Sequence, residues 1–457
     1  MSNAQPRRSF SSPLAFALVS MGAAVGLANV WSFPFVAGEN GGGAFLLLYL
    51  LVLFVVATPI FMGEIILGKL GKASPIKSLR SLRASSGSRL PWVWMAYLGV
   101  ASTILVLSFY VVIAGQALAY GFEAIQGTFS GMSELEVSAF GGEFVSSIPK
   151  LIVWMLIFMT ATGLIVARNI NDGIEKAGVF LMPTLVIMLL GMIIYGAIYG
   201  DFSQAVDFLF GVRFEDFTPK VILEAMGQAF FTIGIGVGGM MMLGTYMGDD
   251  VNLPKMTAVI VIADLVIALM AGLMIFPLVF AGDVSPAAGP NLIFQVLPLV
   301  FGDIPGGSVV GALFFILLTF AALTSAILLM APSVQWMQDI GYSRRRGALM
   351  MSALVAVLSL MTIFSYNIAS DFYPLGFIPM FNEMTMFDLI RKGINNIVLP
   401  IGGFAFSWMV AWGLNRDEVI GALNGGSPAF QAAWYYSLKY IAPVSITAIL
   451  LYTVIGF

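Results

Sequence analysis

The chain has 457 residues, of which 59% are apolar and 10% are charged, and its net charge is −3. A soluble domain has about 25% charged residues, so a mean hydropathy of +0.96 excludes a soluble globular protein. The chain contains no Cys and no His, which excludes disulfides, thiolate chemistry and the commonest metal ligand. The composition therefore indicates an integral membrane protein.

Eleven segments are apolar over the roughly 20 residues that a helix needs to cross a bilayer. They are residues 14–37, 43–68, 92–122, 149–167, 174–199, 219–246, 255–280, 308–337, 347–366, 387–413 and 431–455. We therefore predict an all-α membrane protein with eleven transmembrane helices. No soluble domain fits between them, because the longest gap covers only residues 123–150.

The Lys and Arg residues predict the orientation, because cytoplasmic loops are enriched in them. With the N-terminus inside, sixteen of the 21 fall on the cytoplasmic side. Residues 69–89 carry six of them and no acid. We expect a multi-pass protein of a bacterial cytoplasmic (inner) membrane, with its N-terminus inside and its C-terminus outside.

Two of the predicted helices are interrupted by glycine. The first contains Ser20–Asn29, and the sixth contains Gly227–Gly239. Each opens a set of five helices, which gives a single domain with repeats at residues 14–200 and 219–413 and an extra helix at 431–455. Such a pair of broken helices is typical of a transporter site built on inverted repeats. The alternative is close helix packing through small residues.

Several polar residues lie within the apolar segments. Glu64 is interpreted as a carboxylic acid that braces the broken backbone, and Asp264 as a cation ligand. Asp339, near the inner end of the eighth helix, could be an ordinary interfacial charge. Oxygen donors without nitrogen or sulfur donors suit hard cations, and more of them are supplied by Asn29, Thr232, Thr324 and Ser325. The hydroxyls of the last two could instead bond their own helix.

Three motifs at their expected helices make the chain resemble the neurotransmitter:sodium symporters. They are Gly22–Pro34 followed by Glu39–Phe45, then Gly227–Thr232, then Ala321–Ser325. The resemblance covers essentially the whole chain. It implies a transporter, not an enzyme, that imports a small amino acid with sodium by alternating access. It also implies that the first and sixth helices unwind at mid-membrane.

The resemblance implies two Na⁺ sites and one substrate site. The first ion would be bound by Ala24, Asn29, Thr232 and Asp264, and the second by Gly22, Val25, Ala321, Thr324 and Ser325. Tyr110 matches the tyrosine that holds the substrate carboxylate. The rest of the substrate pocket would be lined by Ala24, Gly26, Val106, Phe231, Thr232, Gly234, Val237, Ser325 and Leu329. Because Gly234 and Val237 are small, we expect an apolar amino acid of medium or large size.

The gates differ from the family pattern on the outer side. Arg7 and Asp339 match the cytoplasmic gate pair, with Tyr246 beside them. In the outer gate, Ser32 stands where the family has an Arg, and Arg391 stands where it has an Asp. Arg391 could favour an anionic amino acid or an amino-sulfonate as substrate, or could simply pair with Asp388 one turn earlier.

Asp264 places a fixed carboxylate where chloride-dependent relatives bind an anion. Tyr49, Gln228 and Thr232 match the positions around that anion. A second negative charge would be repelled there, so we expect transport without chloride. Protonation of an empty carrier at Asp264 would give proton antiport.

Other functions are less compatible with this sequence. A channel filter would require a repeated segment, and an enzyme would require a nucleophile and base that are not evident. A substrate sensor on the same scaffold stays an alternative. We expect an amino acid and the bilayer as partners and no nucleic acid; the oligomeric state stays open.

Overall fold

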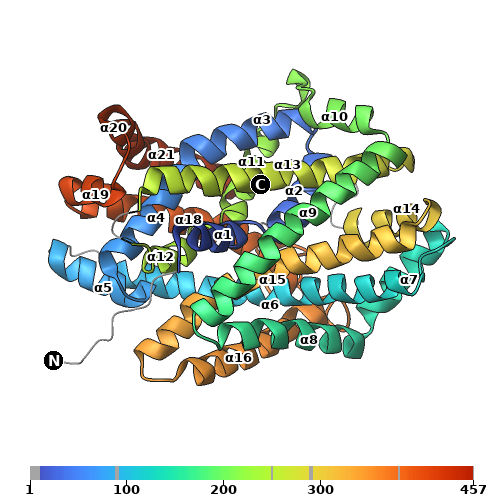
Figure 1. The fold of residues 1–457 in the computed structure, drawn as a ribbon, viewed down its shortest axis with the longest axis horizontal. Coiled ribbons are helices and arrows are strands. Elements are labelled where there is room, and N and C mark those ends of the chain that lie inside the picture. The colour runs from blue at the N-terminus through green and yellow to red at the C-terminus, as the bar shows by residue number, and fades with distance from the viewer. Residues whose placement is uncertain (1–10, 88–91, 249–250, 288–291, 379–380, 456–457) are drawn as a thin grey trace.

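The computed structural model describes residues 11–87, 92–248, 251–287, 292–378 and 381–455. Within these ranges every regular element is a helix (Figure 1). The longest elements are α6 (Trp92–Ile125), α13 (Leu253–Ala281), α15 (Gly307–Asp339) and α9 (Lys176–Tyr199). In Figure 1, α6, α13 and α15 run roughly along the long axis of the molecule and α9 crosses it obliquely, as expected for a bundle that crosses a membrane.

Eight helical stretches in the described residues are long and apolar enough to cross a membrane, and each coincides with a predicted span. They are Gly43–Gly71, Trp92–Ile125, Ile148–Val166, Asn171–Tyr199, Leu253–Ala281, Gly307–Asp339, Arg344–Ser365 and Met386–Gly413. Three of these spans combine α-helices with short π-helical segments. The first consists of α3 (Gly43–Val52), η2 (Leu53–Ala57) and α4 (Thr58–Gly71), and the second of η3 (Asn171–Glu175) and α9. The third consists of α17 (Met386–Gly393), η7 (Ile394–Val398), α18 (Leu399–Trp408) and η8 (Met409–Gly413). The remaining two single helices are α8 (Ile148–Val166) and α16 (Arg344–Ser365).

Of the other three predicted spans, the first and sixth are divided, whereas the last is continuous. The first consists of α1 (Pro13–Ala24), η1 (Ala28–Ser32) and α2 (Phe33–Glu39). The sixth consists of α11 (Pro219–Thr232) and α12 (Gly239–Gly244). The last consists of α20 (Pro428–Tyr436), η9 (Ser437–Ile441) and α21 (Ala442–Ile455). The first and sixth are thus interrupted at residues 25–27 and 233–238, within the glycine-containing motifs.

Glycine geometry explains the interruption between α11 and α12. Gly234, Gly236 and Gly238 have φ values of +63°, +89° and +76°, a region that L-residues with side chains rarely adopt. Alternation of these glycines with apolar residues prevents the helical hydrogen-bond pattern from continuing. Carbonyl and N–H groups of residues 233–238 are thereby freed to bind side chains or ligands.

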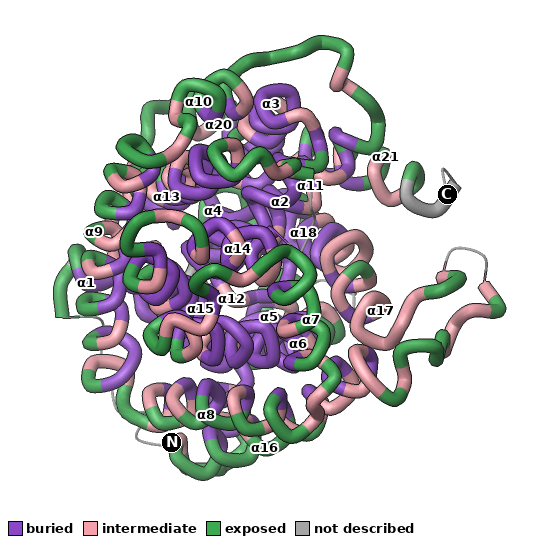
Figure 2. The backbone as a smooth tube through the Cα atoms, turned by 90° about the vertical axis from the view of Figure 1, so that its right-hand side faces the viewer, coloured by how far each residue is buried: buried purple, intermediate pink, exposed green. Residues whose placement is uncertain are grey.

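The central packing unit is the pair α6 and α15, which contact each other along their length. The helix α1 packs against α9, α13 and α15, whereas α12 packs on α4. Figure 2 shows the buried backbone at the centre of the bundle and the exposed backbone around it. The two interrupted segments therefore lie inside the protein, shielded from lipid.

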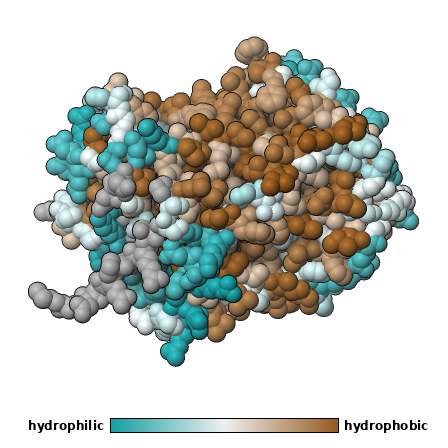
Figure 3. Space-filling view, in the orientation of Figure 1, coloured by the Kyte–Doolittle hydropathy of each residue, from teal (hydrophilic) through white to brown (hydrophobic). Residues whose placement is uncertain are grey.

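The connecting helices gather at the two ends of the molecule. Towards one end lie α5 (Pro75–Ser86) and α19 (Arg416–Leu423); towards the other lie α7 (Glu134–Ser146), α10 (Phe202–Phe210) and α14 (Leu297–Asp303). The short helices η4 (Phe214–Asp216) and η5 (Leu292–Val296) respectively follow α10 and precede α14 in the chain. Figure 3 shows hydrophobic side chains across the middle and hydrophilic side chains towards both ends. That distribution fits a bilayer around the middle and water at the ends.

Candidate functional site

The segment between α11 and α12 is held by a carboxyl group from α4. Glu64 is fully buried, and its Oε1 accepts a hydrogen bond from the backbone N–H of Gly236. A Cβ atom on Gly236 would lie 2.3 Å from the carbonyl oxygen of Leu399, so no side chain fits there. Glu64 therefore braces the interrupted backbone, as the sequence analysis expected.

A buried polar cluster joins η1, α11 and α13. The Asn29 amide donates from Nδ2 to Thr232 Oγ1 at 3.0 Å and to Asp264 Oδ1 at 2.8 Å. Thr232 Oγ1 lies 3.1 Å from Asp264 Oδ2. Asn29 Oδ1 accepts from the N–H of Gly26 at 3.0 Å, which ties the side chain to the break after α1. Three of the four residues predicted for the first sodium site are therefore in mutual contact.

The chemistry of this cluster fits a monovalent hard cation. Asn29 and Asp264 are fully buried and Thr232 nearly so. Thr232 and Asp264 present oxygens to the cluster, and Asp264 supplies the only carboxylate among its described residues, whereas Asn29 presents Nδ2 and its Oδ1 accepts from the Gly26 N–H. Calcium sites use several carboxylates, whereas the described residues of this cluster provide one. Ala24, the fourth predicted ligand, lines the cavity next to the cluster together with Thr232.

Tyr49 and Gln228, which match positions around the anion of chloride-dependent relatives, make different contacts. The buried Tyr49 hydroxyl adjoins Asp264 and Thr232, yet has no hydrogen bond of good geometry within the described residues. Gln228 instead bridges to the first span: its Nε2 donates to the Ala28 carbonyl at 2.8 Å, and its Oε1 accepts from Ser32 Oγ at 2.7 Å. Ser32, in the outer-gate position, is thus bonded to Gln228.

A second group of oxygens joins the end of α1 to α15. Thr324 Oγ1 donates to the Val25 carbonyl at 3.2 Å, and Ser325 Oγ donates to the same carbonyl at 3.1 Å. Thr324 also bonds its own helix at the Ala321 carbonyl, 2.9 Å away. Gly22 is adjacent, since a Cβ there would lie 3.4 Å from Thr324 Cβ. The structure brings all five residues predicted for the second sodium site together.

We expect Thr324→Ala combined with Ser325→Ala to raise the sodium concentration needed for half-maximal uptake by roughly tenfold or more, because two of the ion's proposed ligands are removed. Flame photometry of sodium binding and uptake at graded sodium concentrations would check this. Thr319→Ala is the matched control, because this hydroxyl bonds only the Phe315 carbonyl of its own helix. An unchanged sodium dependence in the double variant would contradict the assignment.

A small cavity lies between the two interrupted segments. All ten residues predicted for the substrate site line it: Ala24, Gly26, Val106, Tyr110, Phe231, Thr232, Gly234, Val237, Ser325 and Leu329. The Tyr110 hydroxyl accepts a hydrogen bond from the N–H of Leu27 at 3.2 Å. The hydroxyl and the helix break after α1 therefore lie at the same end of the cavity. Leu27, Ala28 and Leu399 also line the cavity and were not predicted.

A larger cavity of about 440 Å³ adjoins the site and shares the lining residue Phe231 with it. Ser32, Gln228 and Phe231 lie on its wall, and its charged lining residues are Glu39, Lys220, Glu224, Arg391 and Lys392. Arg391 lies 3.9 Å from Asp388 on the same helix. The structure therefore contains the local pairing that the sequence analysis considered as the alternative role of Arg391.

Asp339, the last residue of α15, is paired with a lysine that was not predicted as its partner. Lys77 Nζ lies 3.2 Å from Asp339 Oδ1. Tyr246, which was expected beside this gate, accepts a hydrogen bond from Gln335 Nε2 at 3.3 Å. Arg7, the predicted gate partner of Asp339, lies outside the described residues.

Comparisons with known proteins point to one family. The sequence model of the Sodium:neurotransmitter symporter family matches residues 7–134 and 132–457. The uncharacterized sodium-dependent transporter YhdH of Bacillus subtilis is 32% identical over 447 residues, covering 97% of this chain and 96% of that protein. The rat sodium-dependent neutral amino acid transporter SLC6A17 is 26% identical over 320 residues, covering 60% and 41%. The crystal structure of MhsT in complex with L-phenylalanine has a TM-score of 0.90 and 34% identity, covering 98% of this chain and 100% of that chain.

Proposed function

Because the chain belongs to the sodium:neurotransmitter symporter family, we propose that it imports a medium or large apolar amino acid coupled to sodium. Transport proceeds by alternating access across the cytoplasmic membrane, with the N-terminus inside. Eleven spans form two five-helix inverted repeats and one extra helix, and the first and sixth spans are unwound at mid-membrane. The observation that carries this proposal is the cavity between the two interrupted segments, which adjoins both clusters of buried oxygens.

The opposite charges of the sodium ion and the substrate carboxylate explain how their binding is coupled. An amino acid carboxylate is costly in the membrane interior unless a cation balances it. The Tyr110 hydroxyl and the N–H of Leu27 lie at the polar end of the cavity, where Thr232 connects it to Asp264. A sodium ion bound by Asn29, Thr232 and Asp264 would pair with the carboxylate. Each would raise the affinity of the protein for the other, because coupling between two binding sites is reciprocal.

The apolar lining favours an apolar substrate over an anionic one. None of the residues that line the cavity is charged, so a second anionic group on the substrate would lack a partner. Arg391 lines the larger cavity instead. The relative MhsT was crystallised with L-phenylalanine, which agrees with an apolar or aromatic side chain. An anionic amino acid or amino-sulfonate stays the second candidate, favoured only by the position of Arg391.

Substrate size is tested by Val237→Phe. Val237 is buried and lines the cavity, so the larger ring would occupy space needed by the substrate side chain. We expect the apparent affinity for phenylalanine to fall by roughly tenfold or more while alanine is less affected. Gly234→Phe is a poorer test, because Gly234 has a φ of +63° and any side chain there strains the backbone. Competition by aspartate or taurine stronger than by leucine would contradict the apolar assignment.

The second ion would tie the first span to α15 through the Val25 carbonyl, Thr324 and Ser325. We propose that release of this ion to the cytoplasm loosens α1 and opens the inner path, which is closed by Arg7 and Asp339. In this scheme Lys77 contributes to the same gate through its ion pair with Asp339.

The inner gate is tested by cysteine labelling, which has a clean background because the chain has no Cys. Removal of a gate charge favours inward-facing states. We therefore expect Tyr246→Cys to react severalfold faster with a membrane-impermeant maleimide when combined with Asp339→Ala or Arg7→Ala. Asp172→Ala, which removes an exposed ion pair with Lys176, serves as the control. Equal labelling rates in all backgrounds would mean that Asp339 forms only a surface contact.

A further inference from the structure

An aromatic surface on the last two spans is not explained by transport. On α18 and η8, Phe404 stacks on Trp408 at 5.9 Å between ring centroids, and Trp408 stacks on Trp412 at 5.4 Å. On the neighbouring α20 and η9, Tyr436 stacks on Tyr440 at 6.1 Å. The two rows meet where Trp412 contacts the Tyr440 ring edge to face at 6.0 Å.

This surface faces outwards from the bundle. Trp412, Tyr436 and Tyr440 are each about half exposed, at 49%, 50% and 49%. Side chains four residues apart, such as Trp408 and Trp412, lie on one face of a helix. Aromatic rings that the protein leaves uncovered at the end of a membrane span lie at the level of the lipid headgroups.

Two cations are built into the aromatic surface. The ammonium of Lys439 lies 4.2 Å from the Trp412 ring centroid, 5.6 Å from that of Tyr440 and 5.8 Å from that of Tyr435. The guanidinium of Arg416 lies 5.3 Å from the ring centroid of Tyr435. Both positive charges therefore lie within 6 Å of the Tyr435 ring centroid. Such cation–π contacts orient a positive charge without neutralising it.

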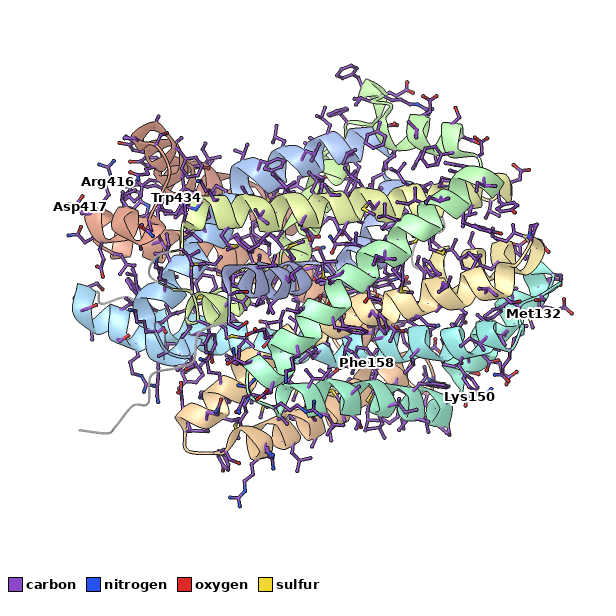
Figure 4. All side chains as sticks on the ribbon, in the orientation of Figure 1. Met132, Lys150, Phe158, Arg416, Asp417 and Trp434 are labelled. Carbon is purple, nitrogen blue, oxygen red and sulfur yellow. The ribbon has the colours of Figure 1, made fainter. Side chains whose placement is uncertain are left out.

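Within the described residues, no carboxylate oxygen lies within 4.0 Å of the Lys439 or Arg416 nitrogens. Neither Lys439 nor Arg416 forms an ion pair there, although the exposed Asp417 follows Arg416 directly in the chain. Figure 4 shows Arg416 and Trp434 at the end of the molecule where α5 and α19 lie, opposite Met132 and Lys150. This is the end with the Lys- and Arg-rich segment 69–89, which we assign to the cytoplasm.

We propose that Lys439 and Arg416 bind the phosphate of an anionic phospholipid in the cytoplasmic leaflet. The acyl chain of that lipid lies along Trp412, Trp408 and Phe404. Charge complementarity identifies the occupant, because basic pockets between membrane helices on the cytoplasmic side bind anionic headgroups. The apolar row that continues from the cations into the bilayer region distinguishes a lipid from a free phosphate ion.

The test is native mass spectrometry of the purified full-length protein with added phosphatidylglycerol or phosphatidylcholine. We expect the wild type to retain phosphatidylglycerol preferentially. The variant Lys439→Gln with Arg416→Gln should bind it roughly tenfold more weakly and bind phosphatidylcholine unchanged. The matched control, Arg345→Gln with Arg346→Gln, removes two exposed cations from the same side of the membrane and should behave as the wild type. Trp412→Leu should weaken retention while keeping the charges.

Three outcomes would overturn the proposal. Equal losses in the test and control variants would mean that net charge alone attracts the lipid. Competition by soluble glycerol phosphate as strong as by the lipid would identify a free-phosphate site. If the wild type were a dimer and the double variant a monomer, with equal lipid retention in both, the surface would be an interface between copies of the chain. Thermal stabilisation by sodium in each variant would verify that it is folded.

Discussion

Gly26→Ala is expected to abolish most substrate uptake. A Cβ atom on Gly26 would lie 2.1 Å from Ser325 Oγ, 2.9 Å from Ser325 Cβ and 3.0 Å from the Tyr110 hydroxyl. One added methyl group would thus displace Ser325 from the Val25 carbonyl and crowd the polar end of the cavity. Overpacking costs about 1–3 kcal/mol, so we expect substrate affinity to fall by roughly 10- to 100-fold.

The control for this prediction is Gly191→Ala in α9. No atom lies within 4 Å of a Cβ built on Gly191, so the same change there should leave uptake and expression unchanged. Scintillation proximity binding of labelled phenylalanine would measure affinity independently of transport. If Gly26→Ala binds phenylalanine like the wild type, the cavity is not the substrate site.

Asp264→Asn is expected to change both the sodium and the anion requirement. The variant keeps the shape of the side chain and removes the only carboxylate bonded to Asn29 and Thr232. We expect the wild type to transport equally well in chloride and in gluconate, because a fixed negative charge makes a second anion redundant. In gluconate, the variant should require at least about tenfold more sodium, and chloride should restore part of its activity.

An internal pH dye tests the remaining part of the role proposed for Asp264. If an empty carrier returns with a proton at this position, uptake by the wild type should alkalinise the proteoliposome lumen and uptake by Asp264→Asn should not. Asp172→Asn, at an exposed carboxylate paired with Lys176, is the control for removal of one negative charge. Strong chloride stimulation of the wild type would contradict the assignment of Asp264.

Much of the fold could be predicted because the bilayer imposes simple rules on sequence. Long apolar segments predicted all eight helical stretches in the described residues that are long and apolar enough to cross a membrane. The glycines at positions 234, 236 and 238 predicted an interruption that their positive φ values explain. A family motif singled out Asn29, and the position of an acid within an apolar segment singled out Asp264; the structure places the two in contact.

Other contacts could not be predicted, because they depend on how helices without a shared motif are positioned. Gln228 matches a position around the anion of chloride-dependent relatives, and the motif did not predict that it bonds Ser32 and the Ala28 carbonyl. The pairing of Lys77 with Asp339 joins a surface helix to α15. Leu399 reaches the cavity from α18. Neither apolar periodicity nor charge patterning carries information about such pairings.

The most direct test of sodium-coupled import is uptake of labelled phenylalanine into proteoliposomes under an inward sodium gradient. We predict accumulation above the external concentration, and loss of that accumulation when an ionophore collapses the sodium gradient. Sodium-dependent binding without accumulation would contradict the transport account and identify a substrate sensor on the same scaffold. Accumulation that persists without sodium would contradict the proposed coupling.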